Sequence, residues 1–166
     1  MSRRDFVPLL GTALVGGVLL SFTEKSSYLI EMPREFNPPP SLKPGDTVGI
    51  CAPAGTIRRD SEVVDFQKII HGMGFETKVG KNVKNKHGYL AGTDQERADD
   101  FMSMIKDENV KAIFFLRGGW GCARLLPLLD FDAIKSNPKI IMGFSDITTL
   151  LNAITEKTKM ITFHGP

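Results

Sequence analysis

Short apolar runs alternate with stretches of helical periodicity along most of the chain. The runs have the length of single strands, and enough residues separate them for a helical crossover. They span residues 47–51, 75–79, 110–116, 139–142 and 160–163. The pattern therefore predicts five strands with helices between them.

Two of the intervening stretches have the clearest helical periodicity. The first ends at Gly72 and Gly74, which are typical helix-terminating residues. The second begins with a capping box, in which the Thr93 hydroxyl and the Glu96 carboxylate satisfy free backbone amides. Residues 147–154 predict a further helix. The predicted buried faces are Val63, Phe66, Ile70 and Met73 in the first helix and Ala98, Phe101, Met102 and Ile105 in the second.

The alternation of strands and helices predicts the fold class. Strands joined by right-handed helical crossovers form a parallel sheet with helices on both faces. We therefore expect an α/β domain of the flavodoxin-like or Rossmann-like kind. Ligands of such sheets bind beyond the carboxyl ends of the strands. The turns to inspect are residues 52–55, 117–121, 144–147 and 164–166.

Residues 1–27 differ from the rest of the chain. Arg3 and Arg4 precede an apolar run over residues 7–22 that has no polar face, which disfavours a buried amphipathic helix. The Ser-Arg-Arg-x-Phe core predicts a twin-arginine-like export signal and a periplasmic protein. No Ala-x-Ala cleavage site precedes Glu24. A retained membrane anchor through residues 7–22 is therefore the alternative to a cleaved signal.

Residues 28–41 contain four of the ten prolines of the chain and predict an extended linker. The folded domain is then expected over residues 42–166, a suitable size for one α/β domain. The 21 basic and 19 acidic residues are too nearly balanced for a protein that binds by neutralising phosphates. Nucleic acid is therefore not an expected partner.

The two cysteines, Cys51 and Cys122, each fall near the carboxyl end of a predicted strand or the start of a helix. We expect two free thiols, with a disulfide between them as the alternative in an oxidising compartment. Neither cysteine has a neighbouring base that would favour a nucleophilic thiolate. No cluster has metal-ligand spacing, so the sequence predicts neither a metal nor a cofactor. A flavin-binding or redox role would rest on fold analogy alone.

Ser145 lies in the tight turn Gly143-Phe144-Ser145-Asp146, between a predicted strand and a predicted helix. A serine there is exposed beside the first helical amides, which can stabilise an oxyanion. This setting suits a nucleophile, although the Gly-x-Ser-x-Gly elbow is only half matched because Ile147 occupies the second glycine position. A serine that merely caps the helix is the alternative.

A second candidate turn, Arg-Gly-Gly-Trp-Gly at residues 117–121, follows another predicted strand. Its glycines allow positive φ or close approach of a ligand. A phosphate cradle is one interpretation, but the spacing matches neither common phosphate-binding motif. A second is an amide donor for an oxyanion beside Ser145, with Arg117 free to bind a carboxylate. The third is a tight turn in which Trp120 packs in the core or at its rim.

Several motifs occur in order from Leu42 to the end of the chain. They are residues 42–50 (LKPGDTVGI), 52–53 (AP), 91–97 (AGTDQER), 117–121 (RGGWG), 124–127 (RLLP), 130–131 (DF), 137–139 (NPK), 143–148 (GFSDIT) and 162–166 (TFHGP). Together they closely resemble the LD-carboxypeptidase family of serine peptidases, and specifically its N-terminal domain.

The resemblance implies that Ser145 is the nucleophile and that the backbone amides of Asp146 and Gly119 bind the oxyanion. It implies release of the terminal D-alanine from murein tetrapeptides, while some relatives cleave peptide-nucleotide antibiotics. The expected partner is a murein peptide, and the oligomeric state stays open, a homodimer included. The residues expected to contact the substrate are Arg117, Gly118, Trp120 and His164.

The family places its catalytic glutamate and histidine in a separate C-terminal domain. Residues 42–166, which carry the resemblance, do not include that domain. A serine hydroxyl is a weak nucleophile without a base in reach. His71 ends a predicted helix, His87 lies in a polar loop, and His164 matches a His-Gly-Pro segment that is not the triad histidine. We therefore expect the chain alone to be inactive or nearly so. A non-catalytic module that binds cell-wall peptides, or a pseudoenzyme fragment, is the alternative.

Overall fold

A computed structural model describes residues 36–166, so the predictions for residues 1–27 and the first part of the predicted linker lie outside the described residues. Five parallel strands form one sheet in the order β2-β1-β3-β4-β5. This is the strand order of flavodoxin-like doubly wound sheets. The strands are β1 (Thr47–Cys51), β2 (Glu76–Val79), β3 (Val110–Phe115), β4 (Ile140–Gly143) and β5 (Phe163–His164).

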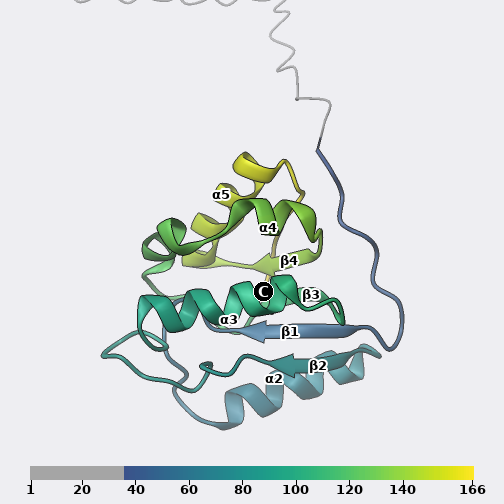
Figure 1. Cartoon of the computed structure of the whole chain (residues 1–166). Helices are drawn as coiled ribbons and strands as arrows, with labels where there is room; N and C mark the ends of the chain where they lie inside the picture. Colours follow the sequence, from purple (N-terminus) through teal and green to yellow (C-terminus); the bar gives the residue numbers. More distant parts are fainter. Residues whose placement is uncertain (1–35) are drawn as a thin grey trace, which may run out of the picture. The chain divides into compact units, whose positions relative to one another are not determined.

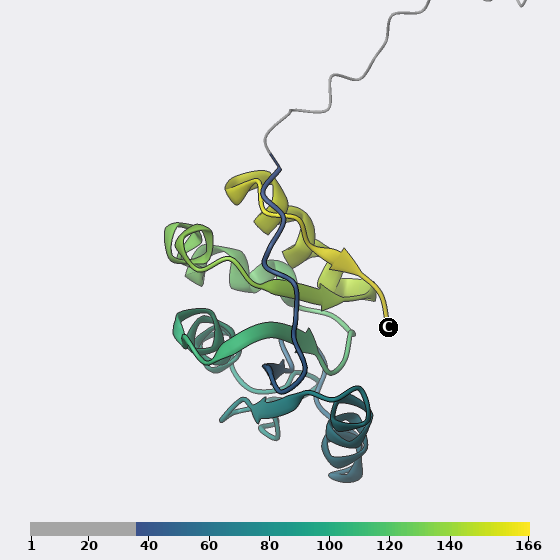
Figure 2. The same ribbon diagram turned by 90° about the vertical axis from the view of Figure 1, so that its right-hand side faces the viewer.

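Helices cover both faces of the sheet, as the sequence predicts (Figures 1 and 2). α2 packs on one face beside β1 and β2, whereas α3, α4 and α5 pack on the other. The helical elements are α2 (Ser61–Gly72), α3 (Asp94–Lys106), α4 (Phe131–Ser136) and α5 (Thr148–Thr158), with the short 3₁₀ segments η1 (Cys122–Leu128) and η2 (Ser145–Ile147).

Strand β3 is apolar on both faces and joins the two layers of the core. Ile113 and Phe115 point into the larger cluster under α3, α4 and α5, whereas Ala112 and Phe114 belong to the cluster under α2. A parallel strand buried on both faces is expected to be a continuous apolar run rather than an alternating one. This explains why residues 112–116 form one unbroken hydrophobic stretch, whereas Lys111 near the start of the strand is exposed.

The predicted capping box of α3 is confirmed. The Glu96 amide donates to the Thr93 hydroxyl at 3.2 Å, and the Thr93 amide donates to the Glu96 carboxylate at 2.8 Å. In α2, Val63 and Ile70 are buried as predicted. Met73 is not, because it is the C-cap residue and lies beyond the last helical turn.

The end of the fold differs from the prediction. A fifth strand was expected over residues 160–163, but β5 begins at Phe163, and Met160 instead forms an isolated bridge with Asn37. The Asn37 amide donates to the Lys159 carbonyl at 2.8 Å, and the Asn37 carbonyl accepts from Ile161 at 3.1 Å. The end of the predicted linker therefore lies on the domain. Contacts between distant segments decide this pairing, and local hydrophobicity does not encode them.

The described helices all belong to this layered domain. No helix within residues 36–166 has the length and apolar character needed to cross a membrane. The predicted signal or anchor over residues 7–22 lies outside the described residues.

Candidate active site

The candidate site lies at the carboxyl ends of β1, β3 and β4. The connections after β1 and β3 lead to opposite faces of the sheet, and doubly wound sheets bind their ligands at such a position. There the Gly55 amide donates to the Gly118 carbonyl at 3.2 Å. This bond joins two of the turns that the sequence identified, residues 52–55 and 117–121.

Ser145 follows β4 with a left-handed backbone, at φ = 60°. A residue other than glycine in this conformation costs roughly 1–2 kcal/mol, and such strain gathers at functional sites. Phe144 is the N-cap of η2, and no side chain caps that segment. The interpretation of Ser145 as a capping residue is therefore wrong.

The close packing of Gly143 and Ile147 makes the turn tight. A Cβ on Gly143 would lie 2.7 Å from Ile147 Cγ2, so only glycine fits there. Ile147 is fully buried. A buried isoleucine thus stands where a nucleophile elbow has its second glycine, and the strained serine conformation is still formed.

Gly118 brings the backbone of the second turn against Ser145, and Gly119 brings it against Gly55. A Cβ on Gly118 would lie 2.9 Å from Ser145 Cβ and 3.3 Å from Ser145 Oγ. Gly119 has φ = 137°, and a Cβ on it would lie 2.9 Å from the Gly55 nitrogen. A side chain on Gly118 would force the glycine turn away from Ser145, and a side chain on Gly119 would force it away from Gly55.

Two free backbone donors lie beside this contact. Within residues 36–166, the amides of Gly119 and Asp146 donate to no protein acceptor. Asp146 directly follows Ser145, and Gly119 directly follows the glycine that touches Ser145. Preorganised amides of this kind are what an oxyanion requires. The structure therefore places the turn that carries Ser145 and Asp146 in contact with the turn that carries Gly119, through Gly118 and Ser145.

The Asp146 side chain has a role that the sequence did not suggest. Its Oδ2 accepts from the Cys122 amide at 2.8 Å. Cys122 begins η1 directly after the glycine turn, and Gly121 before it has φ = 106°. The carboxylate thus holds the far end of the glycine turn close to the serine turn.

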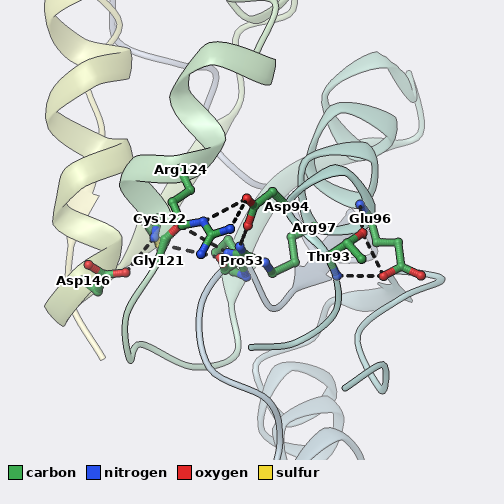
Figure 3. Close-up of polar contacts among 9 residues, drawn as sticks. All are labelled: Pro53, Thr93, Asp94, Glu96, Arg97, Gly121, Cys122, Arg124 and Asp146. Atoms are coloured by element: carbon green, nitrogen blue, oxygen red, sulfur yellow. Dashed lines mark hydrogen bonds and ion pairs between the residues drawn. The ribbon is translucent and has the colours of Figure 1, made fainter. Parts of the chain in front are cut away.

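Arg97 is a buried cation behind the glycine turn (Figure 3). Its side chain is 0% exposed and pairs with Asp94. The same guanidinium donates to the Pro53 carbonyl and, at 3.3 Å, to the Gly121 carbonyl. Asp94 Oδ2 also accepts from Arg124 Nε at 2.8 Å and lies 2.7 Å from Arg124 Nη2. Sequence reasoning treated this stretch as a helix cap and a family motif and missed the network.

Arg117 and Trp120 lie on either side of the glycine pair. Arg117 Nη1 is 3.6 Å from Glu62 Oε2 in α2, so a protein carboxylate already faces it. An open cavity of about 580 Å³ is lined by Arg117 and Glu62 together with Arg58 and Arg59. A substrate carboxylate at Arg117 would therefore compete with Glu62, a residue that sequence reasoning also missed.

Two exposed aromatic side chains border the glycine turn. Trp120 is 60% exposed, so it lies at the rim and not in the core, and the Arg124 guanidinium carbon is 6.0 Å from its ring centroid. Tyr89 is similarly exposed, and its hydroxyl would lie 3.1 Å from a Cβ on Gly119. Tyr89 is distant from the turn in sequence, and no local signal identified it.

None of the three histidines hydrogen-bonds to the Ser145 hydroxyl within the described part of the chain. His164 ends β5 in register with Gly143 and is exposed at the correct edge of the sheet. His71 Nε2 lies 3.1 Å from the Thr77 hydroxyl, and His87 is exposed in its loop as predicted. The described residues therefore bring no histidine into hydrogen-bond contact with the candidate nucleophile.

Both cysteines are free, as predicted, and both are buried. Burial raises the pKa of the Cys51 thiol, and burial together with the Asp146 carboxylate raises the pKa of the Cys122 thiol. Both groups are therefore neutral thiols at physiological pH and poor nucleophiles. Among residues 36–166, no group of three or more His, Cys, Asp or Glu side chains could hold a metal ion.

Comparisons with known proteins identify the family of this domain. The model of the LD-carboxypeptidase N-terminal domain matches residues 48–165. A probable murein peptide carboxypeptidase of Bacillus subtilis is 44% identical over 129 residues, which are 77% of this chain and 40% of that protein. The murein tetrapeptide carboxypeptidase of Pseudomonas aeruginosa is 34% identical over 121 residues, which are 72% of this chain and 38% of that protein.

A solved structure gives the same result for the fold. It is the microcin C7 self-immunity protein MccF, carrying three active-site substitutions of which one is serine to alanine. The TM-score is 0.74 at 35% identity, covering 77% of this chain and 39% of that one. The chain thus spans about two fifths of the length of the relatives it matches.

Proposed function

The chain belongs to the LD-carboxypeptidase family, and from this premise we propose that it carries the nucleophile-bearing part of a site that releases D-alanine from murein tetrapeptides. The observation that carries the proposal is the strained Ser145 at φ = 60°, in contact with Gly118 and flanked by two unpaired amides. The names of the murein carboxypeptidases support the substrate class. The serine among the active-site substitutions of MccF supports serine chemistry.

In the proposed reaction, the Ser145 hydroxyl oxygen attacks the carbonyl carbon of the bond between the L-configured centre and the terminal D-alanine. A general base takes the serine proton, and the amides of Gly119 and Asp146 donate to the developing oxyanion. The carbon–nitrogen bond then breaks, and the D-alanine amine leaves with a proton. Water hydrolyses the resulting ester and regenerates the serine.

We propose that the general base comes from outside residues 36–166. A serine needs a base within hydrogen-bond reach, and no described side chain hydrogen-bonds to Ser145. The chain spans about 40% of the Bacillus subtilis relative. This chain alone is then expected to bind the peptide without turning it over at a measurable rate.

The test incubates the 166-residue chain with a murein tetrapeptide and measures both binding by calorimetry and D-alanine release. The matched variants are Ser145→Ala and, as a control at the opposite edge of the sheet, Ser136→Ala. We expect binding by all three proteins and preference for the peptide with a terminal D-residue over an all-L peptide. Absence of specific binding would contradict the proposed function.

The two assays separate the proposal from its alternatives. Ser145-dependent release of D-alanine by this chain would support the nucleophile and contradict the external base. Joining the chain to a homologous C-terminal domain should create activity that Ser145→Ala abolishes. Binding without any Ser145-dependent product, even in that joined protein, would favour a non-catalytic module that binds cell-wall peptides.

We also propose that the enzyme acts on the cell wall in the periplasm, because Arg3 and Arg4 form a twin-arginine-like motif before the apolar residues 7–22. The test fuses residues 1–27 to a reporter protein. Replacing both arginines with lysine should abolish its export. Export that survives the double substitution would contradict the twin-arginine route.

A further inference from the structure

We propose that Arg97 is a positioning residue, which acts through the glycine turn and not on the substrate. It holds the carbonyls of Pro53 and Gly121 and so sets the Gly119 amide beside Ser145. The inference deepens the proposed function and rests on it for the identity of the ligand. Its structural part, the placement of the turn by Arg97, is tested independently.

The contacts of Arg97 connect three segments that are far apart in sequence. Arg97 lies in the second turn of α3, Pro53 follows β1, and Gly121 ends the glycine turn. The Gly121 carbonyl also accepts from the Arg124 amide at 3.2 Å, which orients it toward the guanidinium. Figure 3 shows the Arg97 side chain lying between these partners. Removing the guanidinium therefore frees the Gly121 carbonyl from α3 and from the β1 turn, whereas the bond between the Gly55 amide and the Gly118 carbonyl remains at the start of the glycine turn.

The guanidinium of Arg97 is better suited than a lysine ammonium to hold two backbone carbonyls in place. A planar guanidinium presents several donors in a rigid fork, so it can bind two carbonyls and a carboxylate at once. An ammonium is a compact charge on a flexible stem and cannot reproduce that geometry. Arg97 Nε is buried without a hydrogen-bond partner. The group thus bears an unpaired donor at a cost to stability, while its other nitrogens hold the backbone.

Glycine flexibility makes such a restraint necessary. Gly118, Gly119 and Gly121 lie within four successive residues, and two of them have positive φ. A glycine-rich segment loses more conformational entropy on ordering than other segments. The Gly55 amide restrains the Gly118 carbonyl at the start of the turn, and the Asp146 carboxylate restrains the Cys122 amide at its end. Arg97 adds the restraint at the Gly121 carbonyl.

The turn carries its own spectroscopic reporter. Trp120 is the single tryptophan of the chain, and it lies between Gly119 and Gly121. The Arg124 guanidinium stands 6.0 Å from its ring centroid, and Asp94 links Arg124 to Arg97. The Trp120 indole resonance and the amide resonances of the three glycines therefore report the position of the turn without any assay of activity.

The experiment compares the 166-residue chain with Arg97→Lys and Arg97→Met by heteronuclear NMR and by binding of a murein tetrapeptide. Two controls are Lys106→Met, which removes an exposed cation from the same helix, and Arg124→Met, which removes the cation over Trp120 and its ion pair with Asp94 but leaves the bonds of Arg97 to Pro53 and Gly121 in place. We expect both Arg97 variants to shift and broaden the Gly119 amide resonance. Losing one well-placed amide hydrogen bond should raise the tetrapeptide Kd about tenfold.

The controls distinguish positioning from general stability. Lys106→Met should leave all turn resonances unchanged, and Arg124→Met should move the Trp120 indole but not the Gly119 amide. A folded Arg97→Lys protein with an unchanged Gly119 amide would overturn the inference. If both Arg97 variants fail to fold, Asp94→Asn, at a partly exposed site, must move the Gly119 amide for the inference to stand.

The outcome for the proposed function is read separately. If the unmodified chain binds no tetrapeptide, the proposed function fails, whereas the NMR spectra still decide whether Arg97 places the turn. If the chain binds the peptide and both Arg97 variants bind it equally well, the proposed function stands and Arg97 has no part in it.

Discussion

Two buried cations hold backbone carbonyls at opposite edges of the same sheet. At the carboxyl edge, Arg97 is 1% exposed and binds two carbonyls from distant turns. At the amino edge, Lys139 is 6% exposed and donates to the carbonyls of Asp107 and, at 2.6 Å, Val110. Each cation thus ties together the connections between strands and helices on its side.

The surroundings of the two cations differ. Arg97 has a carboxylate partner, and the backbone near it adopts positive φ at Gly119, Gly121 and Ser145. Lys139 makes no ion pair within the described residues, and burial lowers the pKa of its amine. A buried charge alone therefore does not identify a site. Strained backbone with free amide donors next to it distinguishes the carboxyl edge.

The largest stability effect is expected at the amino edge. Lys139→Met removes two charge-assisted hydrogen bonds, although the Asp107 carbonyl still accepts from the Val110 amide at 3.2 Å. A hydrogen bond to a charged group is worth about 1.5–3 kcal/mol, so we expect a loss of about 2–4 kcal/mol. Urea unfolding measures it, with the exposed Lys135→Met as control. Tetrapeptide affinity and the Trp120 resonance should not change. A change in either would contradict the view that Lys139 stabilises the fold without affecting the site at the carboxyl edge.

A matched pair of glycine substitutions probes the backbone at each edge. Gly121→Ala meets both a φ of 106° and Leu90 Cδ2 at 2.9 Å, whereas Gly45→Ala meets a φ of 86° and open space. We expect losses of about 2–3 and about 1 kcal/mol respectively in thermal unfolding. Only Gly121→Ala should weaken tetrapeptide binding. Equal losses would mean that packing against Leu90 contributes nothing.

Replacing the two strained residues with glycine should stabilise the protein. Ser145 and Lys159 both have positive φ, at 60° and 58°, and glycine adopts this conformation without a Cβ penalty. Because glycine also costs unfolded-state entropy, the net gain is about 0.5–1 kcal/mol for each. Calorimetric melting temperatures measure the gain, with Ser145→Ala as the control that keeps the strain. A destabilised Ser145→Gly protein would contradict strain at this turn.

The smallest effects concern pH, at the two ends of α3. The Thr93 amide and hydroxyl hold the pKa of Glu96 below its ordinary 4.5, and Lys78 holds the pKa of Asp107 below its ordinary 3.8. Each carboxylate therefore contributes fully to the stability of the fold at pH values above its ordinary pKa. This contribution is lost as the pH falls through the lowered pKa of the folded state. Glu96→Gln and Asp107→Asn should each flatten the acid side of the stability curve.

Added salt should affect the stability contributions of these two carboxylates differently. Asp107 is stabilised by an exposed ion pair, which salt screens, whereas Glu96 accepts hydrogen bonds from the neighbouring backbone and hydroxyl. Added salt should therefore shrink the effect of Asp107→Asn and leave that of Glu96→Gln nearly unchanged. Equal salt sensitivity in denaturation at low pH would contradict this assignment of causes.

Much of the fold was predictable because its signals are local. β1 has the predicted bounds, and the α3 cap is formed by Thr93 and Glu96 alone. Apolar runs and helical periods predicted the parallel sheet, and the carboxyl ends of parallel strands necessarily meet at one edge. This is why Ser145 and the glycine turn could be predicted to share a site before any coordinates were known.

The remaining features depend on partners that are distant in sequence. Arg97 binds Pro53 and Gly121, which are 44 and 24 residues away. Arg117 was expected to await a carboxylate ligand, but the packing of α2 places Glu62 opposite it. No periodicity or short motif encodes such pairings, because they arise only when separate segments pack together.

The amino-acid sequence by itself determined the layered α/β architecture, the family and the residues that gather at one sheet edge. Hydrophobic period, capping and turn chemistry act over a few residues, so the chain displays them directly. Only the tertiary structure decided that Ser145 is strained and that the Gly119 and Asp146 amides are left unpaired. It alone decided which of two buried cations stands behind the site. These properties come from close packing between segments, where fractions of an ångström settle which conformations fit.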